Sequence, residues 1–342
     1  MIGEVIKNSA VNAKIHAKLK NSLKAKDYDK MVSFSTVSQL AAFLKQNAEY
    51  KEALADVSAE SIHRGELERR LKTVINKNIR SLITFSSESD KAFLTLFDIR
   101  DEIWNLKILL RLLFRPSEGY SPNYIETGTL DYEKLFRART FEDFTELLKD
   151  TVYYKVFKPF LGHPEKQSLF ELETALDSLY QNLTFEYIKK YLSKEEQKIA
   201  EKSYGTEVDL QTILFIIRAK IYYGFTADQV LPYVSGKRYR LKGENIRALA
   251  QADSKEAALD AAKNTCYKEL FEGGLNGIEA KVSAYSLKMH KSGFKRKPYS
   301  LESVLCYIKI REVEVRNVIM ITEGIRYGLP PQEIRSYVIG ID

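Results

Sequence analysis

The chain has 342 residues and a formal net charge of +7, with 44% apolar and 29% charged side chains. This composition excludes a disordered chain and a membrane-spanning one, and the length predicts more than one hydrophobic core. Two cysteines exclude a framework of disulfide bonds, and 53 basic residues against 46 acidic ones indicate an anionic partner only weakly.

The first 115 residues contain no proline and only Gly3 and Gly65, so long helices meet few breakers there. The N-terminus is charged and has no apolar block before a small-residue cleavage site, so we expect no signal peptide and a cytoplasmic chain. Helices are predicted over residues 11–23, 38–45, 66–83 and 102–114. One face of the third carries Leu67, Leu71, Val74, Ile75, Asn78 and Leu82.

The helix predicted over Glu102–Phe114 has one apolar stripe, with leucines at i, i+3, i+4 and i+7. Related segments begin at Asp209 and Glu314, so the three acidic residues lie 107 and 105 residues apart. A polar residue follows each acid by three positions, at Asn105, Thr212 and Asn317. Residues at i and i+3 share a helix face, and a catalytic site is rarely needed three times. We therefore expect these six side chains to make structural hydrogen bonds, with one another or with a neighbouring helix.

Other landmarks recur at similar intervals. Glu68, Glu173 and Glu279 precede the three acids by 34, 36 and 35 residues. A Tyr-Lys pair recurs at Tyr50, Tyr154 and Tyr267. Such self-similarity predicts three copies of one helical unit, over residues 1–117, 118–225 and 226–342. Because two-residue alternation is almost absent, we expect an all-α fold with little sheet.

Local signals mark several helix ends and one turn. Ser193 and Glu196 have the spacing of a capping box, which predicts a helix start. Gly224 and Gly328 are placed as helix C-caps at the ends of the second and third units. The glycines between 273 and 277 lack the lysine and hydroxyl residue of a phosphate-binding loop, so we expect a plain turn.

Residues that could perform chemistry are sparse. The four histidines are scattered, and only His63 follows a glutamate, Glu60, at the spacing of a di-iron helix, whose other ligands are missing. No GxSxG nucleophile motif occurs, and no cysteine lies near a histidine in the sequence. The sequence therefore predicts no catalytic, cofactor-binding or metal-binding residue, no small-molecule substrate and no enzyme.

The densest basic run is Lys288–Lys297, which contains Phe294. A solvated loop between two helices is one interpretation. Nucleic-acid binding is another, because cations neutralise phosphate while an aromatic side chain can stack on a base. By charge, we expect Lys295, Arg296 and Lys297 to contact a partner.

Three segments together resemble the C subunit of the prokaryotic V/A-type ATPases, the relative of the d subunit of the eukaryotic V-ATPase. They are NAKIHAKL at 12–19, NLKILLR at 105–111 and EVRNV at 314–318, and the resemblance extends over the whole chain. Lys14 and His16 stand where this family usually carries arginines, and Leu113 stands where a lysine is common.

The resemblance implies a funnel-shaped, all-helical protein of three pseudo-threefold-related domains. Such a protein is expected on the cytoplasmic face of the membrane, held there by the rotor ring of proteolipid subunits. It would receive the shaft formed by the D and F subunits, and it would couple shaft rotation to ring rotation without a catalytic site or cofactor of its own. The alternative from another class is a helical scaffold or nucleic-acid-binding protein that uses the basic run 288–297.

Overall fold

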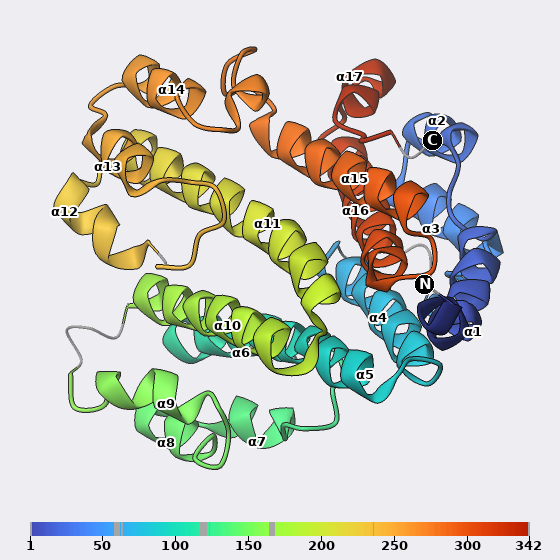
Figure 1. Ribbon diagram of the computed structural model, residues 1–342, viewed down its shortest axis with the longest axis horizontal. Helices are drawn as coiled ribbons and strands as arrows, with labels where there is room; N and C mark the ends of the chain where they lie inside the picture. Colours follow the sequence, from blue (N-terminus) through green and yellow to red (C-terminus); the bar gives the residue numbers. More distant parts are fainter. Residues whose placement is uncertain are drawn as a thin grey trace. The chain divides into compact units, whose positions relative to one another are not determined.

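The computed structural model describes residues 2–57, 62, 64–116, 122, 124–163, 168–234 and 236–340. Within these ranges the chain forms α-helices and short 3-10 helices with no β-strand, so the prediction of an all-α fold is confirmed (Figure 1). The chain divides into two compact units, which are described separately. One comprises Met1–Lys91 with Leu192–Asp342, and the other comprises Ala92–Tyr191.

The unit Ala92–Tyr191 is built on two long helices, α6 and α10, that pack against each other. Its helices are α6 (Leu96–Phe114), α7 (Tyr132–Arg137), α8 (Phe141–Glu146), α9 (Tyr154–Phe157) and α10 (Leu169–Tyr191). Of the predicted stripe on α6, Leu106, Leu109 and Leu110 are fully buried and Leu113 is partly buried. Each fully buried leucine contributes about 1.5–3 kcal/mol of hydrophobic stabilisation, so this stripe anchors the core of the unit.

The other unit combines the N-terminal and C-terminal parts of the chain. The long C-terminal helix α16 packs against α1, α4, α11 and α15. Helix α5 (Glu88–Leu94) spans the point where the two units meet in the sequence. The remaining helices are α1 (Ile2–Leu19), α2 (Ala25–Val32), α3 (Val37–Gln46), α4 (Arg64–Ile83), α11 (Lys194–Ile221), α12 (Ala227–Val230), α13 (Gly243–Gln251), α14 (Lys255–Lys263), α15 (Ile278–Arg296), α16 (Leu301–Arg326) and α17 (Pro331–Ser336).

Helix α4 buries the face that the sequence predicts. All six residues of that face have less than a tenth of their surface exposed: Leu67, Leu71, Val74, Ile75, Asn78 and Leu82. The buried amide of Asn78 is paired, because it donates to a Glu49 carboxylate oxygen and its own oxygen accepts from Lys18 at 2.5 Å. The predicted helix and its buried face are therefore confirmed.

The helix ends predicted from Ser193, Gly224 and Gly328 are also confirmed, whereas the helix predicted over 11–23 has different ends and runs from Ile2 to Leu19. The Ser193 N–H donates to Glu196 Oε2 at 3.0 Å, and this capping box starts α11. Gly224 and Gly328 have φ angles of +64° and +65° just beyond α11 and α16, a left-handed conformation that favours glycine. The glycines from 273 to 277 form turns, as predicted.

The prediction of a loop over the basic run is wrong, because α15 continues to Arg296. Gly293 lies within α15 and permits close packing against α16. A Cβ atom at this position would overlap the carboxylate of Glu302. The loop that joins α15 to α16 is therefore confined to residues 297–300.

Candidate functional site

The first of the three predicted carboxylates, Glu102, is buried in α6 and is held by side chains that follow the helix in sequence. Its two oxygens accept hydrogen bonds from the hydroxyls of Tyr153 and Thr129. Burial raises the pKa of Glu102, although both hydrogen bonds oppose the rise. Burial and the neighbouring carboxylate also raise the pKa of the Tyr153 hydroxyl, so this tyrosine keeps its proton and acts as a donor.

The second carboxylate, Asp209 in α11, is fully buried and holds a stretch of backbone. It accepts from the N–H groups of Tyr239 at 2.9 Å, Arg240 at 2.7 Å and Leu241 at 2.9 Å. The Tyr267 hydroxyl donates to the same carboxylate at 2.7 Å. Because charge-assisted hydrogen bonds are stronger than neutral ones, this carboxylate fixes the 239–241 segment against α11.

The third carboxylate, Glu314 in α16, joins the C-terminal helix to the N-terminal segment. It accepts from the Leu23 N–H at 3.1 Å and from the Tyr50 hydroxyl at 2.7 Å. Arg311 donates to its other oxygen at 2.9 Å and forms an ion pair with Glu49 at 3.2 Å. Burial raises the pKa of Glu314 even though Arg311 acts to lower it.

The three carboxylates therefore share one arrangement, which we call the carboxylate clamp: a buried acid on a long helix accepts from a tyrosine hydroxyl of the next predicted unit. Glu102 lies in the unit 1–117 and its tyrosine in 118–225, and Asp209 and Tyr267 connect the second unit with the third. The third acid returns to Tyr50 in the first unit. The hydrogen bonds thus connect the three predicted units in a closed order along the sequence.

The polar residues that follow the acids also hold backbone. Asn105 donates to the Ile125 carbonyl at 2.8 Å and accepts from its N–H at 3.0 Å. Asn317 makes the same pair of bonds with Ile339, at 2.8 Å and 3.0 Å. Thr212, at the same place in α11, is buried. A side-chain amide suits this role because it offers one donor and one acceptor to a single peptide unit.

Two residues of the clamps were missed from the sequence. The donor to Glu102 is Tyr153, one residue before the Tyr154 of the repeated Tyr-Lys pair. Because Tyr153 and Tyr154 are adjacent, the sequence repeat does not show which of them corresponds to Tyr50 and Tyr267. Arg311 carried no signal of its burial, since an arginine within a helix is usually exposed.

A second feature recurs nine residues after two of the acids. Arg111 in α6 binds Glu173 in α10 through two hydrogen bonds of 2.7 and 2.8 Å. Arg218 in α11 forms the equivalent ion pair with Glu279 in α15. The third long helix carries Glu323 at this place, so the charge is reversed there. The regular spacing of Glu173 and Glu279 in the sequence therefore corresponds to contacts between helices.

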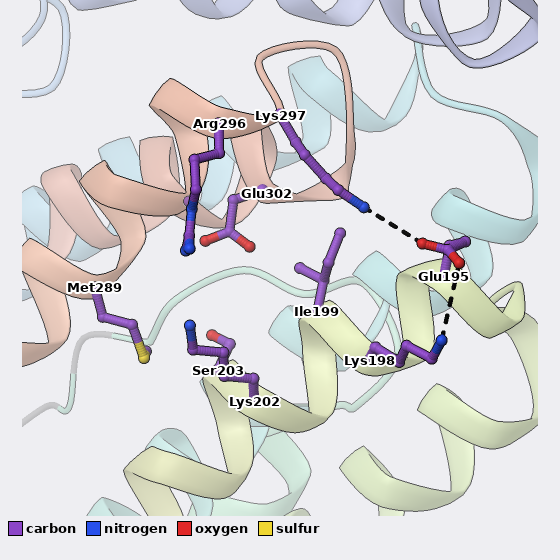
Figure 2. Close-up of a pocket in the computed structure, with 10 residues that line it drawn as sticks. Glu195, Lys198, Ile199, Lys202, Ser203, Met289, Arg296, Lys297 and Glu302 are labelled. Atoms are coloured by element: carbon purple, nitrogen blue, oxygen red, sulfur yellow. Dashed lines mark hydrogen bonds and ion pairs between the residues drawn. The ribbon is translucent and has the colours of Figure 1, made fainter. Parts of the chain in front are cut away.

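The basic run forms one side of a cleft of about 250 Å³ between the N-terminal part of α11 and the α15–α16 corner. We call it the basic cleft, and Figure 2 shows its side chains. Lys297 reaches across to Glu195 at 3.4 Å, and Lys198 lies 3.9 Å from the same carboxylate. The lining residues are Glu195, Lys198, Ile199, Lys202, Ser203, Met289, Gly293, Arg296, Lys297 and Glu302.

The cleft brings together only part of the predicted partner contact. Arg296 and Lys297 line it, whereas Lys295 is exposed on the last turn of α15 outside the lining. Phe294 is half-buried and packs against the His16 ring, with 5.7 Å between centroids. This aromatic side chain is therefore engaged within the protein.

Beneath the cleft, Ser203, His290 and Glu302 lie in the order of a hydrolase triad. His290 Nε2 is 3.0 Å from the Ser203 hydroxyl, and its Nδ1 is 3.6 Å from Glu302 Oε1. Ser203 is 4% exposed in the middle of α11, where backbone N–H groups bond along the helix and offer no oxyanion site. The arrangement is consistent with helix packing and does not provide the geometry of acyl transfer.

No group of His, Cys, Asp and Glu side chains suited to a metal ion occurs among the residues that the structure describes. Within the same ranges, none of the helices combines the length and the hydropathy needed to cross a bilayer. Glu60 and His63, which have the spacing of ligands on a di-iron helix, lie outside the described residues.

Within the described residues, the structure is an all-helical protein in which buried carboxylates hold backbone N–H groups and hydroxyls, with a charged cleft between helices. Comparison with known proteins identifies the family. The chain belongs to the ATP synthase (C/AC39) subunit family, whose sequence profile matches residues 11–337. The resemblance noted in the sequence is thereby confirmed.

Two relatives are similar to this chain over most of their length. The chain is 25% identical to the C subunit of the A-type ATP synthase of Methanocaldococcus jannaschii, over 100% of this chain and 88% of the relative. It is 22% identical to the same subunit of Methanosphaera stadtmanae, over 96% and 86% of the two chains. The family is a structural subunit of a rotary ATP synthase and not the catalytic one, which agrees with the prediction that this chain is not an enzyme.

Proposed function

We propose that this chain is a central-stalk subunit of a V/A-type rotary ATPase and forms the socket between the D and F shaft subunits and the membrane rotor ring. In this role it transmits rotation during ATP synthesis driven by an ion gradient, or during ATP-driven transport of protons or sodium ions. It is peripheral to the membrane on the cytoplasmic face, where the ring holds it. Membership of the ATP synthase (C/AC39) subunit family supports the proposal.

The observation that carries the proposal is the closed order of the three carboxylate clamps. A part that transmits torque has to resist deformation, and a buried carboxylate resists it because separation from its donors leaves a charge unpaired. Each clamp fixes a long helix to the next predicted unit, and the third returns to the first. This closed order suits three pseudo-threefold-related units, 1–117, 118–225 and 226–342, in a funnel that surrounds a shaft.

The proposal includes a partner contact at Lys295, Arg296 and Lys297. All three side chains are exposed at the end of α15. Arg296 and Lys297 also line the basic cleft, which places two of the three beside a concave surface. Charged residues of this kind increase the rate of association and its sensitivity to salt.

The test is size-exclusion co-elution of the purified chain with the D–F pair from the same organism, at low and at high salt. We expect a single-copy complex at low salt that weakens as salt screens the charges. Separate elution at every salt concentration would contradict the central-stalk role. Retention of the free chain on a nucleic-acid column, lost when Lys295, Arg296 and Lys297 are neutralised, would favour the alternative function.

A further inference from the structure

We propose that the basic cleft binds a short acidic segment of a partner protein, in which carboxylate side chains flank an apolar one. The inference rests on the proposed function, because it takes the partner to be another member of the same rotary complex. It adds the chemistry of the contact and the residues that recognise it. The cations of the cleft, its apolar floor and the carboxylates already within it each support this assignment.

Two cations of the cleft are available to a ligand. Lys198 and Lys297 share Glu195, so their charges are partly neutralised. Lys202 and Arg296 are exposed, and neither makes an ion pair with any residue that the structure describes. They come from α11 and α15, on opposite sides of the cleft. A guanidinium can bind a carboxylate through two parallel hydrogen bonds, so Arg296 is suited to an acidic side chain.

The floor of the cleft is apolar. Ile199 from α11 projects into the space, and Met289 and Gly293 line the α15 side (Figure 2). Methionine adapts to irregular apolar surfaces, because it is unbranched and has three rotatable bonds. The volume of about 250 Å³ exceeds what one carboxylate fills, so the cleft also has room for an apolar side chain between the cations.

The carboxylates of the cleft disfavour a phosphate backbone. Glu302 lies beside Arg296 in Figure 2, and Glu195 occupies the other end of the cleft. A chain with a negative charge on every residue would meet these acids, whereas a peptide can place its carboxylates only where the cations are. Phe294, the aromatic within the basic run, packs against His16 and so is not free to stack on a base. We therefore favour a protein partner.

The first experiment compares charge reversals in the assembled complex. The double variant Lys202→Glu with Arg296→Glu is added to the ATP synthase from which this chain has been depleted, and binding is measured at low salt. The control is Lys255→Glu with Lys288→Glu, which makes the same change of charge at exposed positions outside the cleft. We expect the cleft variant to bind about tenfold more weakly or worse, and the control to change binding less than about threefold.

The second experiment identifies the occupant. Met289 is replaced by the photo-cross-linker p-benzoylphenylalanine, the complex is irradiated, and the cross-linked peptide is sequenced by mass spectrometry. We expect a peptide that contains at least two acidic residues beside an apolar one. Cross-links to lipid, to nucleic acid or to a segment without acidic residues would overturn the inference, as would equal effects of the two double variants. If the wild-type chain itself fails to join the depleted complex, the proposed function fails first, so the two failures are distinguishable.

Discussion

The three buried carboxylates use different donors. Asp209 accepts from three backbone N–H groups and a tyrosine. Glu314 has the Arg311 guanidinium beside it. Glu102 accepts from two neutral hydroxyl groups, and the effect of burial on its pKa outweighs them. The donors to Glu102 are uncharged, so its response to pH can be tested without disturbing an ion pair.

Glu102 should make the stability of the protein fall as pH rises. Burial raises its folded pKa above the ordinary value of 4.5, so between these two values the folded chain holds a proton that the unfolded chain has released. The free energy of unfolding then decreases with pH in this window. Glu102→Gln cannot titrate, so the stability of wild type relative to this variant should be greatest at and below pH 4.5 and should decline toward neutral pH.

Urea denaturation of both proteins from about pH 4 to about pH 8 measures this difference. Glu126→Gln, at an exposed position, provides a control that should follow the wild type throughout. A relative stability that rises with pH, or that stays constant while the control behaves as expected, would contradict the assignment of the raised pKa to Glu102.

At the scale of elements, Gly205 allows a loop to approach α11. It lies one turn before Asp209, under the segment whose N–H groups bind that carboxylate. A Cβ atom at Gly205 would lie 2.5 Å from the Cβ atom of Tyr239. Because a Cβ atom is bonded directly to the backbone, it cannot rotate away as the end of a long side chain can. Glycine at this helical position is therefore required by packing, although alanine has the better helix propensity.

Gly205→Ala should destabilise the protein by about 1–3 kcal/mol, because the added methyl group forces the 239–241 segment away from Asp209. Gly65→Ala in α4 is the matched control, since no atom lies within 4 Å of the added methyl group there. This control should be neutral or stabilising by up to about 1 kcal/mol. Urea unfolding measures both values.

Hydrogen exchange locates the effect of the same variant. The amides of Tyr239, Arg240 and Leu241 should exchange faster in Gly205→Ala, since each donates to Asp209 in the wild type. If the variant is less stable but these three amides exchange as slowly as in the wild type, the destabilisation arises in another part of α11.

At the scale of the whole molecule, the clamps determine which fragments can fold. Glu102 and Tyr153 both lie within Ala92–Tyr191, together with a buried core that joins α6 to α10. Glu314, by contrast, lies far along the chain from Leu23 and Tyr50, which donate to it. A fragment that ends at residue 117 therefore keeps these donors and loses their acceptor.

We expect residues 92–191 expressed alone to be helical by circular dichroism and to unfold cooperatively in urea. Residues 1–117, which form one predicted sequence unit, should show no cooperative transition. In this fragment Glu102 loses both of its hydroxyl donors, and the leucine stripe of α6 loses the α10 residues against which it packs. Cooperative unfolding of 1–117 together with a disordered 92–191 would show that the sequence repeat, and not the clamp, determines the folding unit.

Features that depend on neighbours in sequence were predicted well. The leucine stripe of α6, the buried face of α4, the capping box at Ser193 and the left-handed glycines after α11 and α16 all agree with the structure. Their physical basis is local, since helix periodicity and caps involve residues only a few positions apart. The loop predicted over 288–297 is wrong because that interpretation rested on the density of basic charge, whereas α15 continues to Arg296 and packs against α16, with Gly293 beside Glu302.

The sequence by itself determined the helical class of this protein, the places of its three repeated acids and the family to which it belongs. It could not determine what the acids hold. Apart from Arg311, which lies one turn before Glu314 on the same helix, their partners lie 27 to 291 residues away along the chain: Glu102 meets Thr129, and Glu314 meets Leu23. Only the tertiary structure decided these pairings and the basic cleft. Both depend on how helices that are far apart in the sequence pack together, and a pattern over a few neighbouring residues does not encode that packing.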